Sequence, residues 1–137
     1  KLQSQYTSGP SSIAQKAAEA AYNGPQECVE QMRLAFERRR DLVVGLAKAI
    51  PGLEVNRPQG AFYLFPKCSS YFGKRCGDRV INDAGDLAMY LLEEGHVATV
   101  DGAAFCCPGY IRLSYATSDD NIREAMRRIA EALSRLK

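Results

Sequence analysis

The pattern of apolar and polar residues predicts two consecutive helices at the start of the chain. Ser12 and Gln15 have the spacing of a helix-capping box, and the Ala-rich sequence that follows continues to Tyr22. The Asn-Gly-Pro segment at residues 23–25 separates this helix from a second one, which is expected to end at residue 50. Apolar residues recur there every three or four positions, except that Arg39 occupies the step between Phe36 and Val43, so one apolar stripe is expected along its whole length.

The second helix is long and has a charged face opposite its apolar stripe. About 25 residues with a rise of roughly 1.5 Å each span roughly 40 Å, enough to cross a domain and reach a neighbour. An Arg triplet at residues 38–40 lies among acidic residues, and Arg33 and Glu37 have ion-pair spacing. We therefore favour a solvated, ion-paired face over a phosphate-binding site.

Four later runs have the length and composition of β-strands. They cover residues 53–56, 61–65, 97–100 and 110–116. The run 61–65 is apolar on both faces, so we expect it at the centre of its sheet. Alternation in the last run places Arg112 and Ser114 on one face. The stretch 67–80, with its glycines and mixed charges, is expected to be a mobile loop.

Two further helices complete the pattern. Asp83 is the expected N-cap of a helix that ends at Gly95. Thr117 or Ser118 is expected to cap the last helix, whose apolar residues recur at helical spacing. The resulting order is α, α, β, β, α, β, β, α. It predicts a two-layer α/β sandwich, in which amphipathic helices cover one layer of strands.

Length and composition narrow the class of protein. The 137 residues, 46% hydrophobic and 25% charged, are typical of one folded domain and not of a disordered or fibrous chain. The net charge of +2 does not indicate a nucleic-acid-binding surface, and no apolar run approaches the roughly 18 residues of a membrane span. Five cysteines without regular spacing indicate free thiols in a reducing compartment, so we expect a cytoplasmic location.

Arg112 is the candidate functional residue of this pattern. A guanidinium in a strand, flanked by Ile111 and Leu113, must face solvent, an ion-pair partner or a ligand anion. Its planar fork can bind a carboxylate through two hydrogen bonds. The pattern alone leaves a structural ion pair and a ligand site open. The single histidine, His96, is expected at a helix cap or the surface, and no C-x-x-C pair occurs, so we expect no metal site.

Three distinctive segments occur in order along the chain. They are residues 4–15 (SQYTSGPSSIAQ), 58–65 (PQGAFYLF) and 97–116, which ends in YIRLSYA. Together they resemble the C-terminal part of class I pyridoxal-phosphate-dependent aminotransferases, the fold-type I family that includes aspartate aminotransferase. The joint occurrence of three motifs is more specific than any one of them. The likeness is greatest to the aspartate and prephenate aminotransferase subgroup.

The resemblance implies roles for four residues and a set of ligands. Arg112 would bind the α-carboxylate of an amino-acid substrate, and Gly60 and Ala61 would approach the substrate pocket, where small residues permit close contact. Ser8 would lie near the phosphate of the cofactor, pyridoxal 5'-phosphate, in the neighbouring subunit of a homodimer. The substrates would be an amino acid, expected to be aspartate or glutamate, and a 2-oxo acid.

The resemblance also implies that this chain contributes substrate binding but no catalytic residue. The Ser-x-x-Lys segment that forms the Schiff base has no counterpart among the six lysines, so the chain alone is expected to be an inactive piece of a longer enzyme. In that enzyme, residues 1–24 would end the large cofactor domain. Residues 25–50 would form the connecting helix, and residues 51–137 the small C-terminal α/β domain.

Two positions depart from the family's usual sequence. Asp101 stands where proline is usual before Gly102, and Cys106 stands where glycine is frequent after Phe105. A different shape is therefore expected for the loop before Arg112.

Other functions remain open. One alternative is an aminotransferase for prephenate, alanine, aromatic amino acids or kynurenine. Another is a non-catalytic module that binds carboxylates, because a fold and one arginine do not establish a reaction. A third is an interaction module that uses the long amphipathic helix.

Overall fold

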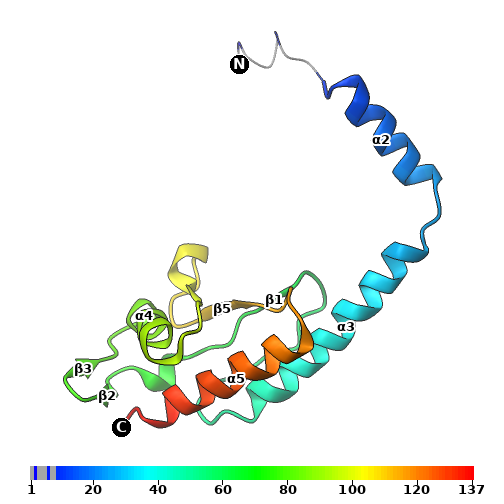
Figure 1. The fold of residues 1–137 in the computed structure, drawn as a ribbon. Helices are drawn as coiled ribbons and strands as arrows, with labels where there is room; N and C mark the ends of the chain where they lie inside the picture. The colour runs from blue at the N-terminus through cyan, green and yellow to red at the C-terminus, as the bar shows by residue number, and fades with distance from the viewer. Residues whose placement is uncertain (1, 3–5, 7–8) are drawn as a thin grey trace. The chain divides into compact units, whose positions relative to one another are not determined.

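The computed structural model of the chain describes Leu2, Tyr6 and residues 9–137 (Figure 1). It divides into two compact units, Lys1–Leu34 and Ala35–Lys137. Within the described residues, no helix is both long enough and apolar enough to cross a membrane. The mixture of helices and short strands agrees with the expected α/β class.

The first unit holds helix α2 (Ser12–Asn23) and the first part of helix α3 (Glu27–Lys48). Ser11 caps α2, because its hydroxyl accepts a hydrogen bond from the Ala14 backbone N–H at 3.3 Å. The capping position expected at Ser12 is therefore wrong by one residue. A capping side chain must come from the residue just before the first helical turn.

In the second unit, strand β5 lies at the centre of a three-stranded antiparallel sheet. The strands, in spatial order, are β1 (Tyr63–Leu64), β5 (Ile111–Ser114) and β4 (Val100–Asp101). Leu64 pairs with Leu113 on one side of β5, and Val100 pairs with Arg112 on the other. The register therefore fixes which side chains of β5 share a face with which neighbours.

Residues 61–65 lie at the edge of this sheet, so the prediction of a central strand there is wrong. Only Tyr63 and Leu64 pair as a strand, and only with β5. Leu64 is fully buried in the core, whereas the rings of Tyr63 and Phe65 contact other aromatic rings. The run is apolar on both faces because aromatic rings, and not a second layer of helices, cover its other face.

Two other predicted strands are shorter than expected. The segment 53–56 contributes a single bridge, in which Glu54 and Lys67 exchange two backbone hydrogen bonds of 3.1 and 3.0 Å. The strand predicted from Val97 begins only at Val100. The Val97 backbone N–H still donates to the preceding helix, at 3.1 Å, so it is not available to a strand partner.

The segment 67–80 is not the loop that its composition predicts. It contains a 3-10 helix and a two-stranded hairpin: η1 (Ser69–Tyr71), β2 (Arg75–Cys76) and β3 (Arg79–Val80). Arg75 exchanges two backbone hydrogen bonds, of 2.8 and 2.9 Å, with Lys137 at the other end of the unit. The hairpin is therefore held by a partner that is distant in sequence and that a local pattern cannot reveal.

Two helices complete the second unit, α4 (Ala84–Gly95) and α5 (Asp119–Ser134). The Asp83 carboxylate accepts a hydrogen bond from the Asp86 backbone N–H at 2.8 Å, which confirms the predicted N-cap of α4. Ser118 caps α5, since its hydroxyl accepts from the Asn121 N–H at 3.2 Å. His96 caps the C-terminus of α4 in a left-handed conformation, with φ 52°.

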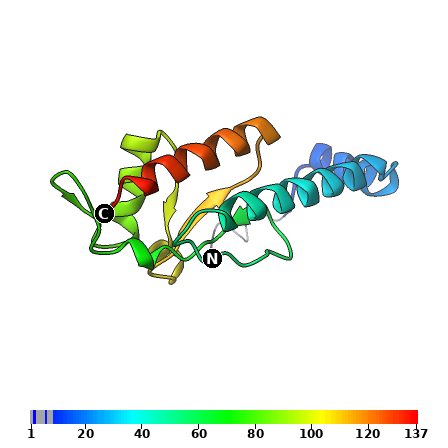
Figure 2. The same cartoon turned by 90° about the horizontal axis from the view of Figure 1, so that it is seen from below.

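The core of the second unit lies between the sheet and the helices (Figures 1 and 2). Its fully buried members include Ala47 of α3, Leu64 of β1, Leu87 of α4 and Ile111 of β5. Ile129 of α5 is 1% exposed. Helices α3, α4 and α5, strands β1 and β5, and the 3-10 helix η1 through Tyr71 thus contribute to one apolar core.

The Arg triplet of α3 forms ion pairs, in agreement with the expected charged face. Arg38 and Arg39 approach the Asp119 carboxylate of α5 with Nε–Oδ distances of 3.2 and 3.5 Å. Arg40 approaches Asp41 at 3.0 Å. The Arg38 hydrogen bond lowers the pKa of Asp119. The Arg38 and Arg39 pairs connect α3 to the first turn of α5.

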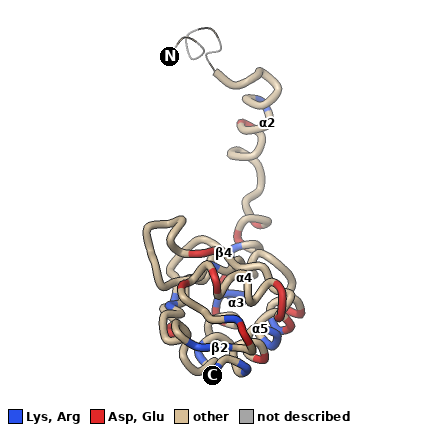
Figure 3. The backbone as a smooth tube through the Cα atoms, turned by 90° about the vertical axis from the view of Figure 1, so that its left-hand side faces the viewer, with Lys and Arg blue, Asp and Glu red and all other residues tan. Residues whose placement is uncertain are grey.

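Acidic and basic residues also lie together along α5 (Figure 3). The Glu124 carboxylate accepts hydrogen bonds from Arg127 at 2.7 Å and from Arg128 at 2.8 Å. These guanidinium groups lower the pKa of Glu124 to about 2. The pairs have the helical spacings that stabilise an exposed helix face.

Replacing Asp83 by alanine should destabilise the fold. The change removes the acceptor of the Asp86 N–H, and losing such a cap costs about 1 kcal/mol. The free energy of unfolding, measured by urea titration, should fall by that amount. Asp83→Asn is the matched control, because an asparagine oxygen can accept the same hydrogen bond. Equal losses in both variants would contradict the role of the cap.

The pKa of Glu124 predicts a pH-dependent contribution to stability. The folded pKa of about 2 lies below the ordinary value of 4.5, so the stabilisation is complete above pH 4.5 and is lost as pH falls toward 2. Glu124→Gln should therefore lower the melting temperature at pH 7 and lower it less at pH 3. Differential scanning calorimetry at the two pH values measures this, and the prediction fails if both differences are equal.

Candidate functional site

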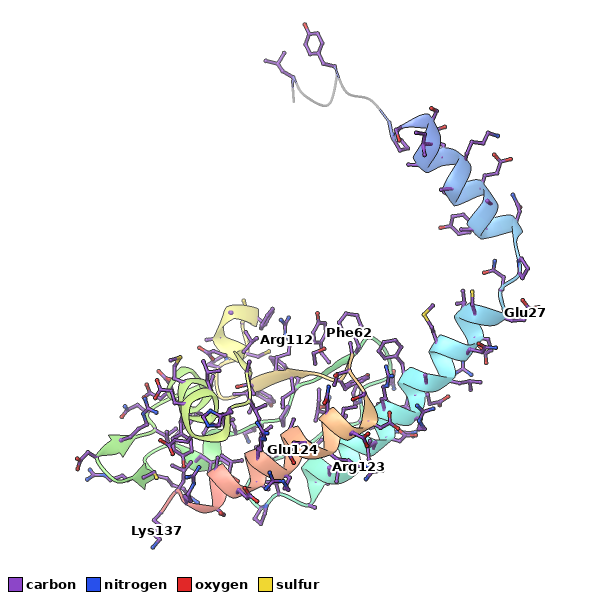
Figure 4. All side chains as sticks on the ribbon, viewed as in Figure 1. Glu27, Phe62, Arg112, Arg123, Glu124 and Lys137 are labelled. Carbon is purple, nitrogen blue, oxygen red and sulfur yellow. The ribbon has the colours of Figure 1, made fainter. Side chains whose placement is uncertain are left out.

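The face of β5 that points away from the core carries a single cationic side chain. Ile111 and Leu113 are buried, at 0% and 9% exposure, while Arg112 between them is half-buried on the opposite face. Ser114 shares that face, as the alternation predicted. Figure 4 shows Arg112, and Phe62 close to β1, on the side of the sheet away from α5.

Two aromatic rings flank the guanidinium of Arg112. Its Cζ atom lies 4.4 Å from the ring centroid of Tyr63 on β1 and 4.1 Å from that of Phe105. Phe105 ends the 3-10 helix η2 (Gly102–Phe105), which follows β4. Both distances are within the range of cation–π attraction, about 6 Å.

Arg112 forms no hydrogen bond or ion pair with any residue in the described part of the chain. The structural ion pair that the sequence left open is thus not formed among these residues. The rings of Tyr63 and Phe105 contact the guanidinium, and its N–H groups, unpartnered among the described residues, can bind an anion. A planar carboxylate fits that capacity with two parallel hydrogen bonds.

The rings beside Arg112 belong to a longer row of aromatic contacts. Phe65 meets the Phe105 ring edge-on, with centroids 6.2 Å apart, and stacks on the Tyr110 ring at 5.6 Å. On the other side, the Phe62 and Tyr63 centroids lie 4.5 Å apart. These contacts hold the walls of the site in place without any charged group of opposite sign.

The loop that carries Phe105 is folded tightly around Gly102. A Cβ atom at Gly102 would lie 2.4 Å from the Cys107 carbonyl oxygen and 2.6 Å from that of Tyr110, so only glycine fits. The Asp101 carboxylate accepts a hydrogen bond from the Ala103 N–H at 2.9 Å and caps η2. Gly102 and Asp101 together set the position of η2, and hence of Phe105.

The other predicted site residues are Gly60, Ala61 and Ser8. Gly60 and Ala61 precede β1, and the Ala61 carbonyl accepts a hydrogen bond from the Tyr115 hydroxyl at 2.9 Å. Burial raises the pKa of Tyr115, which keeps this hydroxyl a donor. A Cβ atom at Gly60 would meet nothing within 4 Å in the described chain. Ser8 lies outside the described residues.

Sequence analysis did not identify Tyr63 and Phe105 as part of the site. Tyr63 appeared only as a member of an apolar strand, and Phe105 only as a neighbour of Cys106. The alternation of β1 could have placed Tyr63 on the open face once its pairing with β5 was known. Nothing in the local pattern indicates the position of Phe105, because a turn of η2 brings it back over β5.

The cysteines are all free thiols. Cys28, Cys106 and Cys107 are exposed, and Cys68 is buried with its Sγ donating to the Gly109 carbonyl at 3.3 Å. Burial raises the pKa of Cys68 to about 12, so this thiol is protonated at neutral pH. In the part of the chain that the structure describes, no group of three or more His, Cys, Asp and Glu side chains could hold a metal ion.

Comparison with known proteins identifies the family. The model of the aminotransferase class I and II family matches residues 1–129. The chain belongs to this family. The resemblance inferred from the three motifs is therefore confirmed.

Two relatives show how much of such a protein the chain represents. It is 49% identical over 137 residues to an aspartate aminotransferase of Rhizobium meliloti (strain 1021), covering 98% of this chain and 33% of that relative. It is 46% identical over 132 residues to a probable aspartate/prephenate aminotransferase of Rickettsia felis, covering 96% of this chain and 32% of that relative. The chain thus spans about a third of the length of these class I and II aminotransferases.

Solved aminotransferase structures share the fold. The crystal structure of the Rhizobium meliloti aspartate aminotransferase matches with a TM-score of 0.93 and 47% identity, over 99% of this chain and 34% of that one. An aromatic aminotransferase from Pyrococcus horikoshii matches with a TM-score of 0.83 and 33% identity, over 97% and 34%. These matches confirm the expected fold-type I architecture.

Cys106 has the conformation in which glycine is favoured. Its φ of 57° is in the left-handed region, which costs a residue with a Cβ atom roughly 1 kcal/mol. Cys106→Gly should therefore raise the free energy of unfolding by up to about 1 kcal/mol. Cys106→Ala, which keeps Cβ and removes only the thiol, is the control. If urea titration finds the two variants equally stable, the backbone is not strained at this position.

Proposed function

We propose that this chain is the part of a pyridoxal-phosphate-dependent aminotransferase that binds the carboxylate of the substrate, with Arg112 as the binding residue. The reaction would transfer an amino group between an amino acid and a 2-oxo acid. The observation that carries the proposal is the half-buried guanidinium of Arg112, which has aromatic neighbours and no anionic partner among the described residues. Such a group can bind the carboxylate of a ligand.

The names of the relatives favour a dicarboxylic amino acid as the substrate. The Rhizobium meliloti relative is named an aspartate aminotransferase, and the Rickettsia felis relative a probable aspartate/prephenate aminotransferase. We propose aspartate or glutamate as the amino-group donor on that ground. The α-carboxylate is common to all these substrates, so the assignment of Arg112 does not depend on the choice.

Pyridoxal 5'-phosphate is the cofactor that the family implies, and when bound it supplies an electron sink for amino transfer. Two of the described lysines are already engaged with carboxylates. The Lys16 ammonium pairs with Glu19 at 2.7 Å, and Lys67 pairs with Glu54 at 3.0 Å. These side chains are therefore engaged in surface ion pairs. We therefore assign the described part of the chain to substrate binding and none of its residues to cofactor binding.

We also propose the domain organisation that the sequence predicts. Residues 1–24 would belong to a large cofactor domain, residues 25–50 would connect it to a small domain formed by residues 51–137, and Gly60 and Ala61 would border the substrate. Two subunits would form a homodimer, with Ser8 near the cofactor phosphate of the neighbouring subunit. The free thiols support a reducing compartment such as the cytoplasm.

Arg112→Lys should weaken substrate binding in the full-length enzyme that carries this sequence. A lysine cannot form the two parallel hydrogen bonds. The value of kcat/KM for the amino acid should therefore fall by an amount that corresponds to roughly 2–5 kcal/mol of lost carboxylate binding. An amine without the α-carboxylate should react equally with both forms. Arg123→Lys, an exposed position on α5, is the matched control. Unchanged kcat/KM in Arg112→Lys would show that the carboxylate binds elsewhere.

A further inference from the structure

No hydrogen bond or ion pair in the described chain orients the side chain of Arg112, so another kind of contact must do so. We propose that Tyr63 and Phe105 are positioning residues, which hold the guanidinium between them and leave its N–H edge open to a carboxylate. This inference rests on the proposed function of Arg112. It adds two residues that do not contact the reacting atoms and act only through the arginine.

The sheet topology places the two rings on opposite sides of Arg112. Tyr63 comes from β1 and Phe105 from the turn after β4, and β5 lies between those two strands. The Cζ atom is nearly equidistant from the two centroids, at 4.4 and 4.1 Å. With a ring on each side, the edge of the guanidinium carries N–H groups that have no hydrogen-bond partner among the described residues. That edge is where a carboxylate forms two hydrogen bonds.

The rings are themselves held by the fold. Tyr63 lies opposite Ser114 in the β1–β5 register, so the pairing of the strands fixes its place. Phe105 is held by the edge contact with Phe65 and by the tight turn at Gly102. Phe105 is 42% exposed, so it contributes little to the core. An exposed ring that is fixed at 4.1 Å from the arginine has a positioning role more than a packing role.

A pre-oriented arginine changes the binding of the substrate more than the chemistry. An arginine side chain has several rotatable bonds, and ordering it on binding reduces affinity. If the rings order it in advance, their loss should raise KM and leave kcat nearly unchanged. An amine without the α-carboxylate does not use Arg112, so its rate should not respond.

The test compares ring-removing and ring-preserving variants of the full-length enzyme that carries this sequence. Phe105→Leu and Tyr63→Leu should each raise the KM of the amino acid about fivefold, with kcat within about twofold of the parent. Phe105→Tyr and Tyr63→Phe keep the rings and should keep KM within about twofold. Circular dichroism verifies folding, and Phe105→Met replaces Phe105→Leu if that variant does not fold.

The outcomes separate this inference from the proposed function. If the leucine variants keep the parental KM while Arg112→Lys raises it, the rings do not position the arginine and the inference is wrong. If kcat falls and KM does not change, or if the amine without a carboxylate is affected equally, the rings have a general structural role and the inference is wrong. If Arg112→Lys also keeps the parental KM, the proposed function itself is wrong.

Discussion

The pairing of strand β5 along both of its edges is the constraint on which the rest of the second unit depends. Its two neighbours hold it in one register, which directs Ile111 and Leu113 into the core. A shift by one residue would bury the Arg112 guanidinium without a partner and expose both apolar side chains, which is prohibitively costly. The interactions that build the core therefore also place the candidate functional group on the open face.

The open face is stabilised by aromatic rings instead of a second layer of helices. The rings of Tyr63 and Phe105 contact the arginine, and they are themselves contacted by the rings of Phe62 and Phe65, respectively. Aromatic side chains suit this position because they bury large apolar areas and also attract a cation with their faces. A charged partner would compete with a ligand carboxylate, whereas a ring does not. The face can thus be ordered and still be able to bind an anion.

Membership in the aminotransferase class I and II family gives this arrangement a chemical context. The chain spans about a third of the length of its relatives. Under the proposed function, Arg112 binds the carboxylate of the substrate, while Lys16 and Lys67 form ion pairs with Glu19 and Glu54. We therefore propose that these residues contribute the binding and orientation of the substrate. Orienting a substrate requires a fixed hydrogen-bond geometry, whereas reacting with it requires a nucleophile.

The helices, the cap at Asp83, the alternation that separates Arg112 from Ile111 and Leu113, and the family could all be predicted from the sequence. Each of these depends on residues within a few positions of one another or on short motifs. The edge position of β1, the hairpin joined to Lys137, and the rings of Tyr63 and Phe105 beside Arg112 became visible only in the three-dimensional structure. These features depend on contacts between segments distant in sequence, and local periodicity carries no information about which segments meet.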